Sequence, residues 1–290
     1  MKKFEKILLI LIVVILILAI GFVAVNFAMS KINKKANPLV TVEFEGYGTV
    51  KIELYPDMAP NTVKNFIRLA QRGYYDGKTI TDIEEGLIRG GLVTTTDEST
   101  GETTTSGATL SNIKDLADNE TDEEYSIVGE FIENGYNDNT LSHTRGVISM
   151  YRSSYAQYQQ EFAMVQMMGY SDYANDLYKE LYNSQSSGFM ILTEDNANLD
   201  GTYAAFGKVV EGMEVIDAIS KIELQKTTDD NGNEETTTKP VTAPVITKVT
   251  VETYGVDYGI PEVESAFDFD AIFNMFMSSY MSSSGTTTSY

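Results

Sequence analysis

The sequence predicts a mainly β domain, with helices packed on its sheet, behind an N-terminal transmembrane helix. Three patterns predict this. Residues 7–25 carry no charge or strongly polar group, residues 39–54 alternate apolar and polar side chains around a glycine-containing turn, and residues 60–70 show helical spacing. A chain of 290 residues, 42% of them hydrophobic, can bury one sizeable core and a smaller accessory element.

The composition excludes several classes of function. Forty-two acidic residues against 21 basic ones give a formal charge of −21, which would repel a phosphate backbone, so no nucleic-acid partner is expected. The chain has no cysteine and a single histidine, His143. This argues against a thiol nucleophile, a zinc site or a Ser-His triad. We therefore predict no metal and no cofactor.

The N-terminus contains the targeting signal. After a short segment at 1–6, we predict a transmembrane signal anchor over residues 7–29, because the 19 residues from Ile7 to Val25 span ~28 Å as a helix at ~1.5 Å per residue. A cleaved signal peptide is the alternative. Its apolar region is usually shorter, and residues 26–28 (NFA) are a poor cleavage site, so we favour an uncleaved anchor.

Charge counting does not orient this anchor, since three lysines lie on each side of it. An N-terminal anchor followed by a long soluble domain is normally exported. We therefore expect a single-pass protein of the cell membrane, with a linker at residues 30–38 and everything from residue 30 onward on the extracytoplasmic side. The membrane is thus an expected partner through residues 7–29.

The first elements after the linker have clear patterns. Residues 39–44 and 49–54 predict two half-buried strands joined by a tight turn. A helix should follow from Pro60, because proline favours the first turn of a helix and Gly73 lies just beyond its end. Threonine-rich stretches at 94–107 and 226–240 contain few large apolar residues and are expected to be solvated loops or insertions.

Two further segments are predicted to be helical. Residues 153–183 show two apolar faces separated by Gly169, which predicts a helical hairpin. Its methionines and tyrosines could form an adaptable binding surface, although packing against the domain is the commoner role of such stripes. The tail, residues 257–290, is expected to contain a short amphipathic helix that docks on the domain, a neighbouring protein or the membrane.

Five stretches of the chain resemble one family, in the family's order. They are VKIELYP at 50–56 with APNTVKNF at 59–66, GYYDG at 73–77, LSHTRGVISM at 141–150, LDG at 199–201 and FGKVVEGM at 206–213. They resemble the cyclophilin-type peptidyl-prolyl cis-trans isomerases. The resemblance implies a cyclophilin-like domain over residues 39–256, with a closed eight-stranded antiparallel β-barrel capped by two helices.

The same resemblance implies an activity. Family members rotate X-Pro peptide bonds over a barrier of ~18–20 kcal/mol, which requires no bond cleavage, metal or cofactor. Their partners are proline-containing protein or peptide clients. A shallow groove holds the proline in an apolar pocket, and an arginine donates a hydrogen bond to the prolyl nitrogen, which favours the non-conjugated transition state.

The sequence departs from the family in this groove. Residues 80–82 (ITD) align with the family's Phe-His-Arg, so Asp82 occupies the position of the catalytic arginine. One residue is deleted before Ile88, so Leu87 takes the place of an aromatic pocket wall and Arg89 that of a groove glutamine. The resemblance implies the following groove residues: Ile80, Leu87, Met150, Tyr151, Gly188, Met190, Asn198, Leu199 and Tyr203.

These departures leave three hypotheses open. In the first, the protein is a working isomerase in which Arg89 supplies the donor that Asp82 cannot, unless Arg89 merely pairs with Asp82. In the second, it is a catalytically weak or inactive domain that binds proline-containing or extended segments. In the third, it is a structural spacer in which the helical insertion at residues 153–183 fills the groove. His143 is expected to be a packed, hydrogen-bonded side chain.

Overall fold

The structure of the protein is a computed structural model, which describes residue 16 and residues 36–96, 103–228 and 232–284. The chain forms two compact units, residues 1–36 and residues 37–290, and the strands and helices below all belong to the second. Apart from Leu16, the transmembrane span predicted at 7–29 lies outside the described residues. Within the described stretches, no helix is both long enough and apolar enough to cross a bilayer.

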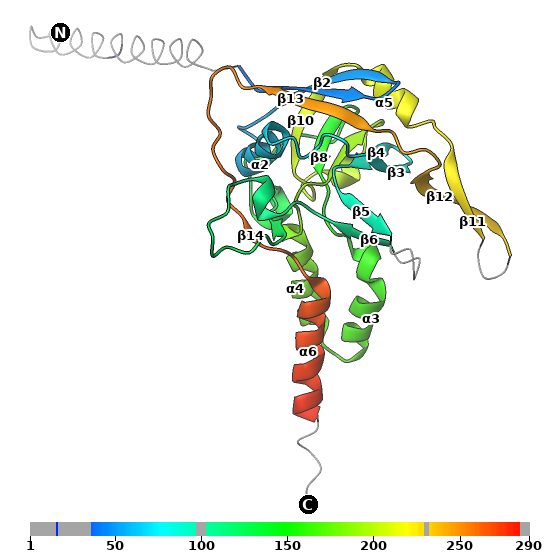
Figure 1. Cartoon of the computed structure of the whole chain (residues 1–290). Helices are drawn as coiled ribbons and strands as arrows, with labels where there is room; N and C mark the ends of the chain where they lie inside the picture. Colours follow the sequence, from blue (N-terminus) through cyan, green and yellow to red (C-terminus); the bar gives the residue numbers. More distant parts are fainter. Residues whose placement is uncertain (1–15, 17–35, 97–102, 229–231, 285–290) are drawn as a thin grey trace, which may run out of the picture. The chain divides into compact units, whose positions relative to one another are not determined.

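Eight antiparallel strands form the main sheet, in the spatial order β13-β1-β2-β10-β8-β9-β4-β3 (Figure 1). The strands are β1 (Leu39–Phe44), β2 (Gly48–Leu54), β3 (Ile80–Glu84), β4 (Leu87–Gly90), β8 (Val147–Met150), β9 (Phe189–Leu192), β10 (Ala205–Glu211) and β13 (Ile246–Glu252). In β1 and β2, every second side chain is buried, which is the alternation that the sequence predicts.

The sheet curls but does not close, which corrects the expected closed barrel. Its terminal strands, β3 and β13, share no ladder. The ends meet instead through one bridge, Thr79–Val245, and a few backbone hydrogen bonds, including Ile80 N to Pro244 O at 2.9 Å. The chain before β3 turns at Gly77, where φ is +83°, so too few extended residues remain there to form a regular ladder.

Two helices pack on the sheet: α2 (Pro60–Gln71) against β13 and α5 (Met213–Ile219) against β2. On α2, Phe66 lies at the centre of the aromatic core, with ring-centroid distances of 4.9 Å to Tyr75 and 5.3 Å to Phe206. The core is therefore enclosed between the curled sheet and these helices. Short 3₁₀ turns complete the connections: η1 (Leu110–Asn112), η2 (Ile132–Asn134), η3 (Tyr155–Tyr158), η4 (Leu181–Asn183) and η5 (Ala197–Leu199).

The N-terminus of α2 is capped from a distant part of the chain. The backbone N–H groups of Asn61 and Thr62 donate to the two carboxylate oxygens of Glu130, at 2.9 and 2.7 Å. These N–H groups have no acceptor within the helix, and a carboxylate is favoured at the positive end of a helix dipole. Glu130 thus fixes the start of the helix that follows the Ala59-Pro60 signal.

The two threonine-rich stretches form hairpins rather than loops. One pairs β5 (Val93–Thr96) with β6 (Thr103–Ser106), and the other pairs β11 (Leu224–Thr228) with β12 (Glu234–Pro240). Threonine is β-branched and therefore favours extended backbone. The expectation of loops considered only the polarity of these stretches and not this preference. The second hairpin bears directly on the candidate site, because β12 packs against β3.

The region predicted as a helical hairpin contains α3 (Gln159–Met167) and α4 (Ser171–Glu180), joined at Gly169, where φ is +87°. The tail first pairs β14 (Glu264–Ser265) with β7 (Tyr125–Ser126) and then forms α6 (Phe269–Ser284). Of the three docking places left open by the sequence, the tail takes the domain itself, because α6 packs on α3 and α4.

Candidate active site

Three candidate residues form one row across the sheet. Asp82 on β3 lies directly opposite Arg89 on β4, and Arg89 lies directly opposite Met190 on β9. Directly opposed residues in antiparallel strands project from the same face. The structure therefore brings the position of the family arginine, its candidate replacement and the pocket residue Met190 onto one surface.

Arg89 is held by two carboxylates and an aromatic ring. Its Nη2 lies 3.3 Å from Asp82 Oδ1 and 2.5 Å from Glu84 Oε1, and its Cζ lies 4.8 Å from the ring centroid of Tyr151. Within the described residues, its buried Nε has no hydrogen-bond partner. The guanidinium is thus oriented on the groove face, with donor capacity that the carboxylates do not use.

Asp82 also pairs with a second cation, Lys239. Its Oδ1 accepts hydrogen bonds from Lys239 Nζ at 2.9 Å and from Thr238 Oγ1 at 2.8 Å, both on β12. Burial alone would raise the pKa of Asp82. The hydrogen bonds from Lys239 and Thr238 and the charge of Arg89 outweigh it, so the pKa of this carboxyl lies below its ordinary value. Asp82 is therefore an anion flanked by two cations.

An apolar cluster lies beside this charged group. Leu87, Met190 and Leu192 are buried together, and Leu199 and Tyr203 pack against them while remaining partly exposed. Met190 and Leu199 lie on different elements, the strand β9 and the turn η5. The cluster therefore presents a partly exposed apolar surface at Leu199 and Tyr203.

Tyr203 is itself held by a buried arginine. The Cζ of Arg152 lies 4.4 Å from the Tyr203 ring centroid and 5.0 Å from that of Tyr182, and its Nε donates to Thr202 O at 2.9 Å. Arg152 is 3% exposed, so it can orient the ring without reaching a ligand.

Some predicted groove residues lie elsewhere. Ile80 and Met150 are fully buried in the main hydrophobic core, so neither can line a groove. Alignment gives a strand position but not the direction of its side chain, and both residues face the interior. Gly188 is buried and accepts a hydrogen bond from Tyr151 N at 2.9 Å, whereas Asn198 is exposed in η5.

Sequence reasoning missed the residues that surround Asp82 and Tyr203. Lys239 and Thr238 belong to a stretch interpreted as a solvated loop, and Arg152 follows the strand motif without belonging to it. For Lys239 the available signal was local: a lysine next to Pro240, at the end of a run of β-branched threonines, is compatible with a strand end. No local signal indicates that this strand end reaches Asp82.

A pocket of about 560 Å³ adjoins Arg89. Its walls come from β3, β4, both threonine-rich hairpins, the helical insertion and the tail. They are largely hydroxylated and carry charges of both signs, from Asp82, Glu84, Glu124, Arg89 and Lys239. The insertion contributes Gln157 and Tyr158 to the wall, so it borders this pocket.

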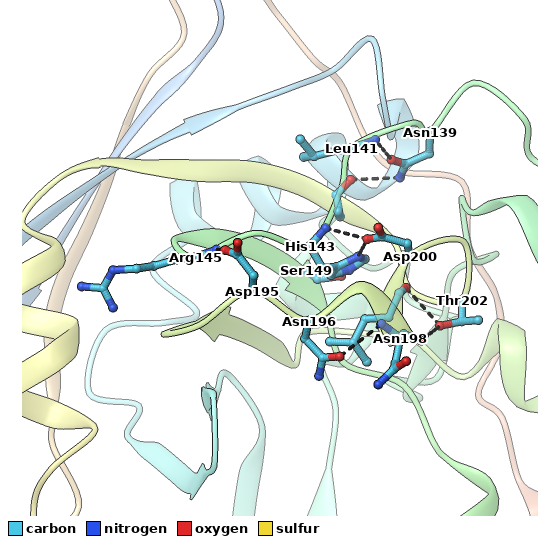
Figure 2. A network of polar contacts seen from close by, with 12 residues as sticks. Asn139, Leu141, His143, Arg145, Ser149, Asp195, Asn196, Asn198, Asp200 and Thr202 are labelled. Atoms are coloured by element: carbon cyan, nitrogen blue, oxygen red, sulfur yellow. Dashed lines mark hydrogen bonds and ion pairs between the residues drawn. The ribbon is translucent and has the colours of Figure 1, made fainter.

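His143 lies in a separate polar network (Figure 2). Its Nδ1 is 3.0 Å from Asp200 Oδ1, and its Nε2 is 3.1 Å from Ser149 Oγ. Since an ionised carboxylate only accepts, Nδ1 carries the proton, and Ser149 donates to Nε2. Burial lowers the pKa of His143 more than Asp200 raises it, so the imidazole is neutral at pH 7.

This Asp-His-Ser order resembles a hydrolytic triad in its distances but not in its accessibility. Ser149 is fully buried and His143 is 2% exposed, so no substrate carbonyl can reach the hydroxyl. Ser149 lies directly opposite Met190 across β8 and β9. The network therefore packs beside the apolar cluster on the same face of the sheet, in agreement with the packed, hydrogen-bonded role expected for His143.

The site as a whole pairs oriented cations with an apolar cluster. Arg89 and Lys239 can donate hydrogen bonds, and the partly exposed Leu199 and Tyr203 can contact an apolar ring. Such an arrangement can bind a neutral ligand and stabilise a change in its charge distribution.

Comparisons with known proteins agree with the resemblance. A family model described as "Cyclophilin type peptidyl-prolyl cis-trans isomerase/CLD" matches residues 39–169 and 174–251. Among curated proteins, "Peptidyl-prolyl cis-trans isomerase-like 1" of Rhizopus delemar is 30% identical over 171 residues, covering 58% of this chain and 72% of that protein. "Peptidyl-prolyl cis-trans isomerase A" of Dickeya dadantii is 28% identical over 183 residues, covering 61% and 69%.

Among solved structures, the chain is similar to a cyclophilin-type peptidyl-prolyl cis-trans isomerase of Cryptosporidium parvum, crystallised in the presence of the dipeptide Ala-Pro. The TM-score is 0.46 at 21% sequence identity, and the match covers 74% of this chain and 98% of the other.

Proposed function

Because the chain belongs to the cyclophilin-type peptidyl-prolyl cis-trans isomerase family, we propose that it rotates X-Pro bonds in protein clients, with Arg89 in place of the missing family arginine. The observation that carries the proposal is the row Asp82, Arg89 and Met190 on one face of the sheet. It supports a donor directly beside an apolar residue suited to a proline ring.

The proposed mechanism needs only hydrogen bonding and shape. The proline ring contacts Leu199 and Tyr203, which pack on the buried Met190, while an N–H of Arg89 donates to the prolyl nitrogen. As the C–N bond twists, conjugation is lost and the nitrogen lone pair becomes a better acceptor, so this hydrogen bond is stronger in the transition state than in the ground state. The ring of Tyr151 and the carboxylate of Glu84 hold the guanidinium in place.

The test compares four chains in an assay of prolyl isomerisation on a short X-Pro peptide: wild type, Arg89→Ala, Arg89→Lys and Asp82→Arg. Arg89→Ala should lower kcat/KM by about 100- to 1000-fold, the usual effect of losing one preorganised donor. Arg89→Lys should retain an intermediate rate, because it keeps a cation but loses the planar fork. Wild-type activity unaffected by Arg89→Ala would refute the role of Arg89.

The second candidate function is binding with little catalysis. It is favoured by one observation: Nη2 of Arg89 is already occupied by Asp82 and Glu84, which can hold the guanidinium away from a substrate. If the wild-type rate equals the uncatalysed rate while Asp82→Arg gains activity, the chain is a binding module for proline-containing or extended segments. In that case, calorimetry should still detect binding of the X-Pro peptide to the wild-type protein.

The proposed site of action is the outer side of the cell membrane. It is supported by the uncharged stretch at 7–25 alone, and it gives the activity a setting in which slow X-Pro isomerisation limits the maturation of exported clients. A reporter that is active only outside the cytoplasm, fused after residue 290, should be active. An inactive reporter, with the matched cytoplasmic reporter active, would rule out this location.

A further inference from the structure

Three helices form a second apolar unit, separate from the sheet core. Helices α3, α4 and α6 lie side by side (Figure 1) and share a cluster in which Phe162, Leu177 and Phe269 are buried. Stacked rings join them, with centroid distances of 3.9 Å for Tyr158 and Phe269 and 4.4 Å for Tyr173 and Phe276. The tail therefore completes a three-helix unit with the insertion.

The far end of this unit carries little charge. Residues 162–171 and 271–284 contain no Asp, Glu, Lys or Arg, in a chain whose formal charge is −21, and Asp172 in the first turn of α4 directly follows the first of these stretches. The two stretches meet, because the ring of Tyr170 contacts those of Phe276 and Tyr280 at 5.5 and 5.8 Å between centroids. A surface with so little charge, on so acidic a protein, favours an apolar partner.

Large apolar side chains are exposed on this surface. Met167 is 82% exposed, Met275 73%, Met281 66% and Tyr170 42%. We name these four residues the methionine tip. Methionine is unbranched and polarisable, so a surface of methionines adapts to ligands of different shape.

The unit is continuous with the pocket next to Arg89. Gln157, Tyr158 and Phe267 line that pocket, and Tyr158 also stacks on Phe269 at the start of α6. A polypeptide bound beside Arg89 can therefore extend along the pocket and reach the three-helix unit at Tyr158 and Phe267.

We propose that the methionine tip binds apolar, unfolded stretches of the polypeptides whose X-Pro bonds reach the groove, an inference that rests on the proposed function. A client must be locally unfolded to present an X-Pro bond, so its apolar side chains are available. Two weak sites on one chain bind such a client more tightly than either alone, because the second contact is intramolecular.

Charge disfavours the other occupants. A second copy would bring together two bodies of formal charge −21. A membrane surface is usually bound through Lys and Arg beside the apolar face, and residues 162–171 and 271–284 contain neither.

The test uses a proline-free probe, so that binding does not depend on the groove. The probe is a fluorescein-labelled, unstructured 20-residue peptide rich in Leu, Val and Phe, with a Ser/Asn/Gly peptide of equal length as the control ligand. The double variant Met167→Ser, Met275→Ser should bind the apolar probe about tenfold more weakly than wild type by fluorescence anisotropy. The matched variant Val210→Ser, Val241→Ser, with side chains 50% and 54% exposed on the sheet domain, should bind like wild type.

A second measurement links the tip to isomerisation. On a short X-Pro peptide the double variant should match wild type, whereas it should accelerate the proline-limited refolding of a protein substrate less than wild type does. Equal binding of the apolar probe by both proteins overturns the inference. So does a tip-dependent dimer in sedimentation, or tip-dependent binding to phosphatidylcholine and phosphatidylglycerol vesicles with no probe binding.

The two proposals fail separately. If no variant shows isomerase activity but the apolar probe still binds through the methionine tip, the proposed function is refuted and the tip remains a polypeptide-binding surface. If the short peptide is isomerised but the double variant binds the apolar probe like wild type, the methionine tip is refuted as a binding surface and the proposed isomerase function stands.

Discussion

Lys239 sets the balance of charge around Arg89. Asp82 and Glu84 both face the guanidinium, and Lys239 shares Asp82 with it. Removing Lys239 leaves Arg89 as the only cation on Asp82 among the described contacts, which should hold the guanidinium back from the prolyl nitrogen. Lys239→Met should therefore lower kcat/KM about two- to fivefold, the fold-change that an ion pair of up to ~1 kcal/mol produces.

Lys226→Met is the matched control for this measurement. Lys226 lies on the same hairpin but pairs with Glu234, at 2.7 Å. Its loss should leave the isomerisation rate unchanged. An equal loss of activity in both variants would show that the hairpin matters only as a structural element.

His143 should make the free energy of unfolding depend on pH near neutrality. Its folded pKa lies below the ordinary 6.5, chiefly because of burial. The unfolded chain therefore binds more protons than the folded one as the pH falls below about 7, so the free energy of unfolding should decrease from pH 7.5 to pH 5.5. Five carboxyl groups have a pKa below the ordinary value and stay ionised in both states over this pH range: Asp76, Asp82, Glu120, Asp122 and Asp217.

Urea unfolding of wild type and His143→Asn at the two pH values measures this effect, and the chain has no other histidine to complicate it. The variant should lose the pH dependence even if it is less stable overall. Parallel slopes for the two proteins would mean that His143 does not cause it.

The cap of α2 gives an expectation at the level of an element. Glu130 accepts two N–H groups at the start of the helix that contributes Phe66 to the core. Glu130→Gln keeps the shape but removes the charge and one acceptor, and should lower the free energy of unfolding by about 1–2 kcal/mol. The exposed Glu85 provides the control, Glu85→Gln, which should change it by less than about 0.5 kcal/mol. Equal effects would exclude capping as the cause.

Local patterns predicted the elements whose causes are local. The alternation in residues 39–54 and the Pro60 start of α2 appear in the structure because burial periodicity and proline geometry act within a few residues. The threonine-rich hairpins were missed, because their polarity was taken to indicate loops although threonine, being β-branched, favours strands. Closure of the barrel was inferred from the family resemblance. It would require a ladder between β3 and β13, but the extended segment after Gly77 is too short and forms only the bridge between Thr79 and Val245.

The candidate site was only partly predictable for a related reason. The row from Asp82 to Met190 follows from strand register, which the family motifs carry. Thr238 and Asp82 are 156 positions apart in the sequence, and Lys239 is the next residue after Thr238. Their contacts with Asp82 depend on how β12 packs on β3. No local pattern contains that information.

At the scale of the whole molecule, the charge of −21 should make stability depend on salt. Self-repulsion destabilises the compact state, and screening shortens its range to ~10 Å at 0.1 M salt. The thermal midpoint should therefore rise between 20 and 300 mM NaCl. Sucrose at equal osmolality controls for non-ionic effects of the solute. A midpoint that falls with NaCl would mean that the ion pairs around Asp82 and elsewhere outweigh the net repulsion.

The pairing of β1 with β13 constrains how the domain can be made. Residues 39–44 have β2 on one side, but their other partner is found at residues 246–252. During synthesis β1 therefore keeps one bare edge until nearly the whole domain has left the ribosome, and bare edges recruit other strands. A nascent chain of this protein should consequently need shielding until its last strand arrives, so an enzyme proposed to assist the folding of others would itself be a late and assisted folder.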